Sequence, residues 1–342
     1  MNLPDQAQRT RTGGGAAPIG LSLVVPILNE AEAIGPFLAR VLPIVEALMR
    51  RQTPALDFEI VFVDDGSSDD GVARLLAQAR KNPAIKIVSL SRNFGKDAAL
   101  MAGLDHVRGA AVVPLDADLQ DPPEAIPEMY AKWREGYDIV FATRIDRGSD
   151  SLAKRASAGL FYRLFNAIAE TRIPNNAGDF RLLDRRVVEA LKQLPERNRF
   201  MKGLYAWVGF RHASVAIVRE ARVAGTSKWR YWSLWNFALD GIAAFSSLPL
   251  RVWSYVGGVI AAASFAYALF LIVHTLILGA DVPGYASLMV AVLFMGGINL
   301  MTLGILGEYI GRTYTEAKRR PLYLVRERIG FAADGADSNS EQ

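Results

Sequence analysis

The sequence predicts an α/β domain with a mainly parallel sheet, followed by a membrane hairpin. Two observations support this prediction. Between residues 21 and 144, short β-branched runs alternate with helical stretches, a pattern typical of parallel sheets covered on both faces. Residues 252–280 and 282–307 contain no Asp, Glu, Lys or Arg. Each run exceeds the ~20 residues that a helix needs to span a bilayer.

Five strands and their intervening helices are expected within the α/β domain. The strands are expected at 21–27, 58–66, 84–91, 110–118 and 138–144, and the helices at 30–51, 73–81, 95–107 and 124–136. Beyond residue 144 we expect a basic helical stretch, a loop at 171–180 and a helix at 184–194. Ligands of such sheets bind beyond the carboxyl ends of the strands, so polar residues there are candidate site residues.

The composition divides the chain into five segments. Residues 1–18 are polar and Gly-rich and are expected to be disordered, and the α/β domain is expected at 19–228. Residues 229–250 are rich in aromatic side chains, which favours an amphipathic helix at the membrane interface over a core helix. The apolar runs form a hairpin at 251–311, with spans at about 252–280 and 285–308. Residues 312–342 are expected to form a cytoplasmic tail.

Basic residues that flank the hairpin predict its orientation. They are Lys228, Arg230 and Arg251 before the first run, and Arg312, Lys318, Arg319 and Arg320 after the second. The connection at 281–284 has no Lys or Arg, so both ends of the hairpin are expected in the cytoplasm, as in a multi-pass protein of the cell inner membrane. The absence of cysteine agrees with a reducing compartment. The formal net charge of +4 is modest and no nucleic-acid-binding motif accompanies it, so nucleic acid is not an expected partner.

An acidic stretch, PLDADLQDPP, follows the fourth expected strand at 114–123. Asp and Pro cluster in ordinary solvated turns, and this is the simplest explanation. In an extended chain, however, Asp116, Asp118 and Gln120 would point the same way and present three oxygen ligands together. Mg²⁺ or Mn²⁺ accepts such a set, usually with a substrate diphosphate completing the coordination.

The ends of the other expected strands favour the functional interpretation. Polar residues stand at every end: Asn29 and Glu30, Asp64 and Asp65, Ser91 to Asn93, Asp116 and Asp118, and Arg144. The carboxyl ends of parallel strands lie at one edge of the sheet, so these polar groups are expected close together. Five unrelated turns without a function would explain this placement poorly. The isolated His106 and His212 lack metal-ligand spacing and are expected to be structural.

Six motifs together resemble a known family. They are VVPILNE (24–30), FVDDGSSDDG (62–71), SRNFGKDAAL (91–100), PLDADLQDPPE (114–124), FATR (141–144) and GDFRLLDR (178–185). In this order they resemble the family-2 glycosyltransferases, and among these the polyisoprenyl-phosphate glycosyltransferases, which include dolichol-phosphate mannose synthases and bacterial undecaprenyl-phosphate glucosyltransferases. The likeness extends from about residue 21 to 320 and includes the two C-terminal spans.

The resemblance implies a GT-A fold that binds a UDP- or GDP-linked sugar. The residues expected to hold the base and ribose are Pro26, Asn29, Glu30 and Asp64, with Asp65 as a weaker candidate. Arg92 and Lys96 are expected near the diphosphate together with Asp116, because guanidinium and ammonium groups both suit phosphate. Without the resemblance, a surface loop would also explain Arg92 and Lys96.

The resemblance also implies a metal and a lipid acceptor. Asp116, Asp118 and Gln120 would ligate Mg²⁺ or Mn²⁺ bridging the two phosphates, which would compensate their negative charge. Asp179 matches the position of the catalytic carboxylate, and Asp118 is assigned to catalysis with it. The candidates for the acceptor phosphate are Arg144, Arg155, Ser157, Arg181 and Lys228, with Lys154 nearby. A solvated helix face and positive-inside charges are alternative explanations for some of these basic residues.

The expected function is inverting transfer of one sugar, with UDP-glucose favoured, to undecaprenyl phosphate on the cytoplasmic membrane face. GDP-mannose or a modified-pentose nucleotide is the alternative donor. A processive polysaccharide synthase is disfavoured because the chain lacks a Q-x-x-R-W motif, and an inactive scaffold because the acidic residues and Asp179 are intact. Gly304, Gly307 and Gly311 on the second span are compatible with helix contacts in a homo-oligomer.

Overall fold

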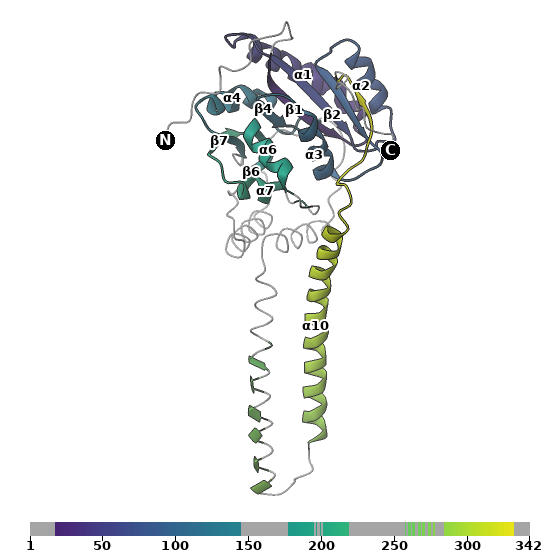
Figure 1. Cartoon of the computed structure of the whole chain (residues 1–342), viewed down its shortest axis with the longest axis vertical. Helices are drawn as coiled ribbons and strands as arrows, with labels where there is room; N and C mark the ends of the chain where they lie inside the picture. The colour runs from purple at the N-terminus through teal and green to yellow at the C-terminus, as the bar shows by residue number, and fades with distance from the viewer. Residues whose placement is uncertain are drawn as a thin grey trace, which may run out of the picture.

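An eight-stranded sheet with the strand order β7-β5-β6-β4-β1-β2-β3-β8 forms the core of the α/β domain, in the upper part of Figure 1. The computed structural model describes residues 18–144, 177–194, 196, 199, 201–218 and 284–331, with single positions between 257 and 277. The strands are β1 (Ile19–Ile27), β2 (Asp57–Asp64), β3 (Ile85–Leu90), β4 (Ala111–Pro114), β5 (Ile139–Arg144), β6 (Ala177–Asp184), β7 (His212–Ile217) and β8 (Val325–Ile329). The helices are α1 (Ala31–Arg50), α2 (Gly71–Ala79), α3 (Lys96–His106), η2 (Pro123–Ala125), α4 (Ile126–Arg134), α6 (Arg185–Gln193), α7 (Met201–Trp207) and α10 (Tyr285–Ala317).

The sheet is mainly parallel, as the sequence predicted. β1 pairs in parallel with β2 and β4, β2 with β3, and β5 with β7. β6 runs antiparallel to both β4 and β5, so β4 and β5 point the same way, and β8 runs antiparallel to β3. All five expected strands are therefore present, and their carboxyl ends lie at one edge of the sheet.

Three segments differ from the secondary structure expected from the sequence. Within the expected loop at 171–180, the strand β6 begins at residue 177. β6 lies between β4 and β5 and pairs with the backbone N–H and C=O groups of both. The expected strand at 110–118 ends at Pro114, after which the chain turns and Leu119 adopts a positive φ of 54°. The expected tail at 312–342 contains β8, which pairs with β3 and so belongs to the sheet.

Two hydrophobic clusters cover the two faces of the sheet. α1 and α4 pack on one face, and α3, α6 and α7 on the other. Alternate residues of β1 enter opposite clusters, with Leu23 and Val25 in the first and Val24 in the second, as the period of a strand requires. α1 keeps its helical path through two internal prolines, and its buried residues recur at three- and four-residue intervals.

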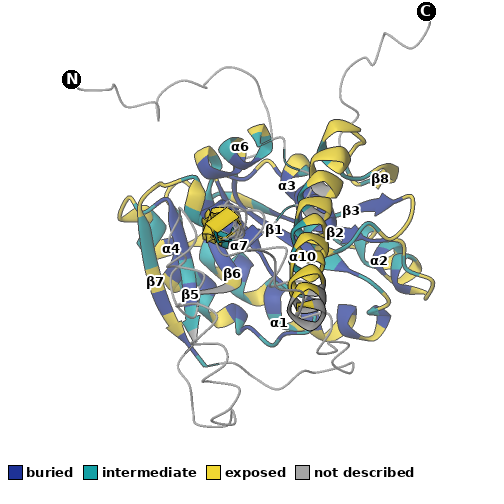
Figure 2. Cartoon of the chain, turned by 90° about the horizontal axis from the view of Figure 1, so that it is seen from below, coloured by how far each residue is buried: buried dark blue, intermediate teal, exposed yellow. Residues whose placement is uncertain are grey.

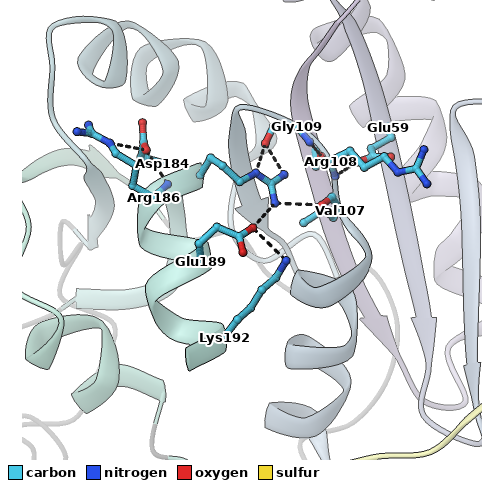
Figure 3. A network of polar contacts seen from close by, with 10 residues as sticks. Glu59, Val107, Arg108, Gly109, Asp184, Arg186, Glu189 and Lys192 are labelled. Atoms are coloured by element: carbon cyan, nitrogen blue, oxygen red, sulfur yellow. Dashed lines mark hydrogen bonds and ion pairs between the residues drawn. The ribbon is translucent and has the colours of Figure 1, made fainter. Parts of the chain in front are cut away.

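The amino ends of the strands are held by a separate polar network (Figure 3). Buried Glu59 accepts from the backbone N–H of Arg108 at 2.5 Å and from Ser22 Oγ at 2.6 Å, and it pairs with Lys86. Arg185, at the start of α6, donates to the carbonyl oxygens of Val107 and Gly109. These contacts give Glu59, Lys86 and Arg185 structural roles at this edge of the sheet.

A long helix extends away from the sheet (Figure 1). α10 has 33 residues, and its described side chains are mostly exposed along its length (Figure 2). The described positions between 257 and 277 are also helical. Among the residues that the structure describes, no helix meets both the length and the hydropathy required of a bilayer span. The expected interfacial helix at 229–250 lies outside the described residues, as does the expected disordered segment at 1–18 except for its last residue.

The close approach of α3 to the sheet depends on Gly103. A Cβ atom at this position would lie 2.2 Å from Val24 Cγ1 and 3.1 Å from Val63 Cγ2. Gly35 of α1 is a matched control, because a Cβ atom there would have no neighbour within 4 Å beyond the adjacent residues of its own helix.

We expect Gly103→Ala to lower the free energy of unfolding by about 1–3 kcal/mol, because the added methyl group must displace α3. Gly35→Ala should change it by less than about 1 kcal/mol, since the higher helix propensity of alanine is opposed by the contact of its Cβ with the ring of Pro36. Thermal melting of both variants, followed by tryptophan fluorescence, measures the two shifts. Equal shifts in the same direction would contradict the close packing of α3.

Candidate active site

The loops that follow β1 and β2 are bound to each other at the carboxyl edge. Asn29 adopts a positive φ of 54°, and its backbone N–H donates to Ser67 Oγ at 2.9 Å. Asn29 Oδ1 in turn accepts from the backbone N–H of Ser68 at 2.8 Å. Asp64 accepts from Ser67 N–H at 2.9 Å and from Ser89 Oγ at 2.8 Å. The side chain of Asp64 is therefore occupied in joining β2 to β3 and to its own loop.

Asp65 holds the loop between β3 and α3. Its two carboxylate oxygens accept from the backbone N–H groups of Phe94 and Gly95 at 2.7 and 2.9 Å. Burial raises the pKa of Asp65, although these two backbone donors oppose the shift. The predicted weaker candidate for ribose binding is thus 3% exposed and committed to the neighbouring loop. The loop at 91–95 takes its shape from this carboxylate.

Two further residues, which sequence analysis did not single out, shape the same edge. A Cβ atom on Gly66, whose φ is +74°, would lie 2.6 Å from the carbonyl carbon of Arg92, so only glycine lets these loops touch. Asp69 accepts from the backbone N–H of Ala31 and of Gly71, both at 3.0 Å, and so joins the first turns of α1 and α2. The glycines and aspartates at 66–71 are typical of such turns, and this composition is the signal in the sequence that indicates their role.

The acidic loop after β4 presents alternate residues toward the same side. Asp116, Asp118 and Gln120 are partly exposed, whereas Leu115, Ala117 and Leu119 are buried. This alternation was predicted from an extended strand, but a turn at 117–118 produces it here. Asp118 Oδ1 accepts from the backbone N–H of Gln120 at 3.2 Å, which keeps the two side chains adjacent.

The oxygen donors of this loop fit a divalent cation in chemical type. Carboxylate and amide oxygens are the ligands that Mg²⁺ and Mn²⁺ prefer. Within the described residues, no three His, Cys, Asp or Glu side chains come close enough to hold a metal by themselves. Mg²⁺ is usually bound by one or two carboxylates together with waters and substrate phosphate oxygens, and Asp116 and Asp118 fit the carboxylate part of such a set.

Lys96 and Asp179 join the acidic loop at the carboxyl edge. Lys96 Nζ, at the start of α3, donates to Asp116 Oδ2 at 2.6 Å, and the two side chains are 51% and 35% exposed. Desolvation lowers the pKa of Lys96, but the charges of Asp116 and Asp179 more than offset it and the pKa is raised. Asp179 reaches this edge because β6 is antiparallel and therefore begins where β4 and β5 end. The exposed Asp179 lies in β6, within the segment predicted to be a loop.

Arg181 lies two residues further along β6 and is buried. It is 4% exposed, and its guanidinium carbon lies 3.9 Å from the centre of the Tyr205 ring. Tyr205 belongs to α7, and burial raises the pKa of its hydroxyl group. Arg181 is thus held against an aromatic ring inside the domain, whereas Asp179 on the same strand is exposed.

The remaining predicted site residues fall into three groups. Pro26 and Glu30 lie at the end of β1, partly exposed, and Arg92 lies exposed with its guanidinium 4.2 Å from the centre of the Phe94 ring. Arg144 is the last residue of β5. Lys154, Arg155, Ser157 and Lys228 lie outside the described residues.

The fold and this edge define an α/β transferase of the GT-A type. Residues 22–192 match the family described as "Glycosyl transferase family 2", and residues 248–313 match the "GtrB C-terminal hairpin". The chain belongs to glycosyl transferase family 2, and it carries the hairpin found at the C-terminus of GtrB.

Curated relatives are similar over nearly their whole length. An uncharacterized glycosyltransferase of Synechocystis sp. is 54% identical over 92% of this chain and 96% of the relative. The bactoprenol glucosyl transferase of Shigella phage SfX is 49% identical over 90% of this chain and 99% of the relative. The uncharacterized glycosyltransferase YkcC of Bacillus subtilis is 41% identical over 92% and 95%. The solved glucosyl-3-phosphoglycerate synthase of Mycobacterium tuberculosis is a distant match (TM-score 0.43, 20% identity, 66% of this chain and 78% of that chain) and carries no argument about function.

Asp69→Ala should destabilise the carboxyl edge, since it removes the acceptor of two backbone N–H groups. We expect a loss of about 1–3 kcal/mol in the free energy of unfolding. Asp70→Ala is the matched control: Asp70 pairs with Arg74 on the exposed surface, and its loss should cost less than about 1 kcal/mol. Thermal melting of the two variants tests this difference, and an equal effect would show that Asp69 does not join the two helices.

Proposed function

We propose that this protein transfers one glucose from UDP-glucose to a polyprenyl phosphate at the cytoplasmic face of the membrane. The class of acceptor and the sugar are supported by the bactoprenol glucosyl transferases, which are 49% identical over 90% of this chain. The match to the GtrB hairpin supports the same assignment. The proposed product is a lipid-linked sugar that serves as a donor for later glycosylation.

The convergence of Lys96, Asp116 and Asp179 at one edge is the observation that carries the proposal. An ammonium and two carboxylates that influence one another's charge can bind a diphosphate and a sugar in adjacent positions. The chain returns from α10 to this same edge, because Val325, the first residue of β8, pairs with Leu90, the last residue of β3. A lipid phosphate held near the hairpin would therefore have a short path to the site.

The donor is proposed to bind across the ends of β1 to β4. Pro26, Asn29 and Glu30 would contact the base and ribose, and Arg92 and Lys96 the diphosphate. Asp64 and Asp65 are buried and hydrogen-bonded to neighbouring loops, so we assign them to shaping the nucleotide site. This assignment differs from the expected direct contact of Asp64 with the nucleotide.

Asp116, Asp118 and Gln120 are proposed to hold a divalent metal together with the diphosphate. Mg²⁺ or Mn²⁺ bound there would act as a Lewis acid and stabilise the charge that develops on the departing nucleotide. Lys96 would then reach the diphosphate from the start of α3, where it now contacts Asp116. Asp118 keeps its place beside Gln120 through the hydrogen bond to that residue's backbone.

Asp179 is proposed to act on the acceptor side of the sugar. A phosphate monoester has a second pKa of about 6 and is largely dianionic at neutral pH, so it needs little help from a general base. We therefore assign Asp179 to orienting the acceptor and stabilising positive charge on the sugar as its bond to the nucleotide loosens. Attack from the face opposite the nucleotide would invert the anomeric centre, and an α-linked donor would give a β-linked product.

Basic groups beyond β5 are proposed to receive the acceptor phosphate. Arg144 stands at the end of β5, at the carboxyl edge, and Arg155, Ser157 and Lys228 remain candidates from the sequence. Arg181 is buried against Tyr205, so we assign it to electrostatic support of Asp179 in place of direct contact with the lipid. Stacking on an aromatic ring suits a guanidinium that must keep a fixed position.

The hairpin is proposed to insert into the membrane. Residues 282–307 carry no charged side chain, and Leu288, Leu300 and Leu303 of α10 are 66%, 72% and 63% exposed. Apolar side chains exposed over such a length need a nonaqueous environment. Gly304, Gly307 and Gly311 have no atom near their Cβ positions among the described residues, which leaves room for another helix beside α10 in a homo-oligomer.

Asp179→Asn should lower kcat by about 10²–10³, because it removes the negative charge that stabilises the sugar as its bond to the nucleotide loosens. UDP affinity should stay within about twofold, because this carboxylate acts on the acceptor side. Glu124→Gln is the matched control: this carboxylate pairs with Arg40 at 2.8 Å on the surface, and its neutralisation should leave turnover unchanged. Steady-state kinetics with UDP-binding calorimetry separates the two effects. Loss of UDP binding in Asp179→Asn would place this residue on the donor side.

Sugar transfer by the purified protein in detergent tests the proposed function as a whole. Undecaprenyl phosphate is offered with radiolabelled UDP-glucose, GDP-mannose or UDP-galactose, with and without Mn²⁺, and beside Asp118→Ala. We expect labelled lipid only from UDP-glucose with metal, and at least about 10²-fold less in the variant, because metal ligands supply much of the transition-state stabilisation. Labelled lipid from GDP-mannose would make GDP-mannose the donor in place of UDP-glucose. If the protein binds UDP but forms no labelled lipid from any donor, the result would favour an inactive scaffold.

A further inference from the structure

The chain that leaves α10 returns to the α/β domain as a strap over residues 319–331. Arg319 turns the chain with a positive φ of 49°, and residues 325–329 then form β8 along the outer side of β3 (Figure 2). At the carboxyl edge, the backbone N–H of Ser91 donates to the carbonyl oxygen of Leu324 at 2.9 Å. The strap therefore meets the first residue of the loop that carries Arg92 and leads to Lys96.

This loop, residues 91–95, has two other supports. Asp65 accepts from the backbone of Phe94 and Gly95, and Gly66 lies against the backbone of Arg92 and Asn93. Both come from the loop after β2, on the inner side. The strap supplies the contact on the outer side, where β3 would otherwise be the edge of the sheet.

Side chains of the strap also fix α3, whose first residue is Lys96. Tyr323 donates its hydroxyl hydrogen to Asp105 Oδ2, near the end of α3, at 2.5 Å. Leu322, Tyr323 and Phe331 pack against the same hydrophobic cluster as Phe94. Phe331 also contacts His106, with 5.7 Å between the ring centres. The strap thus holds both the loop at 91–95 and the helix that follows it.

We propose that the strap is a positioning element of the donor site, with Tyr323 as its principal positioning residue. Through the strap, the end of the hairpin fixes the backbone that presents Arg92 and Lys96 to the donor diphosphate. The inference rests on the proposed function, in which these two side chains bind that diphosphate. A segment more than 200 residues further along the chain thus sets the affinity of Arg92 and Lys96 for the donor diphosphate.

The physical reason is preorganisation. A short loop that binds a charged diphosphate loses affinity when binding must also order its backbone. Asp65 and Gly66 hold residues 92–95. The backbone N–H of Ser91 is held instead by its hydrogen bond to the carbonyl oxygen of Leu324. Loosening the strap would free the first residue of the loop and release the end of α3 at Asp105, so that the helix that begins with Lys96 could tilt on the sheet.

Equilibrium binding of UDP with Mg²⁺ to the full-length protein in detergent tests the inference. We expect Tyr323→Ala to weaken binding about five- to tenfold, since it removes the hydrogen bond and the packing, and Tyr323→Phe about two- to threefold, since it removes only the hydrogen bond. Arg326→Ala is the matched control: its side chain is exposed in β8 and its loss should change affinity by less than about 1.5-fold.

Amide hydrogen exchange at Ser91 distinguishes local loosening of this loop from a general loss of stability. We expect exchange at Ser91 to accelerate in Tyr323→Ala more than at Val61 in the centre of the sheet. Unchanged UDP affinity with a lowered melting temperature, or uniform acceleration across the sheet, would overturn the positioning role. Failure of the wild-type protein to bind UDP would instead refute the proposed function, so the two failures are distinguishable.

Discussion

The concentration of negative charge at the carboxyl edge of the sheet is the constraint on which the rest of the structure depends. Asp64 and Asp65 are both only 3% exposed, and burial of adjacent carboxylates is unfavourable unless donors surround them. The donors come from Ser67, Ser89, Phe94 and Gly95, which belong to three different segments. The buried charge therefore determines how the loops fold around the site.

The same constraint separates the two kinds of acidic residue at this edge. Asp64, Asp65 and Asp69 are satisfied by hydroxyl and backbone N–H groups of the protein, so their contribution is architectural. The carboxylate of Asp116 is partly exposed, and it pairs with the ammonium group of Lys96, whose side chain is half exposed. Groups in this second environment can exchange their partners when a ligand arrives, whereas those in the first cannot without unfolding the loops.

Sequence reasoning predicted the parallel strands and the acidic loop because both depend on local patterns. The alternation around Asp116 and the β-branched runs of β1 to β3 need no knowledge of distant residues. Only the family resemblance indicates Asp179, and the local sequence predicts a loop where the structure has β6. β6 has glycine, aspartate and arginine among its residues, and its pairing with β4 and β5 is a tertiary event that overrides weak local preference. β8 was missed for the same reason, since its sequence VRERI is polar and its partner β3 lies far back in the chain.

The position of β8 in the chain has a consequence for how the protein is made. The outer edge of β3 finds its partner only after residues 325–329 have been synthesised, and these follow the whole hairpin. The edge of β3 in the α/β domain is therefore unpaired with β8 until the hairpin has left the ribosome. An open edge is prone to pairing with other chains. Completion of the sheet is thus coupled to the biogenesis of the hairpin, and a catalytic domain released before that step would be an aggregation-prone intermediate.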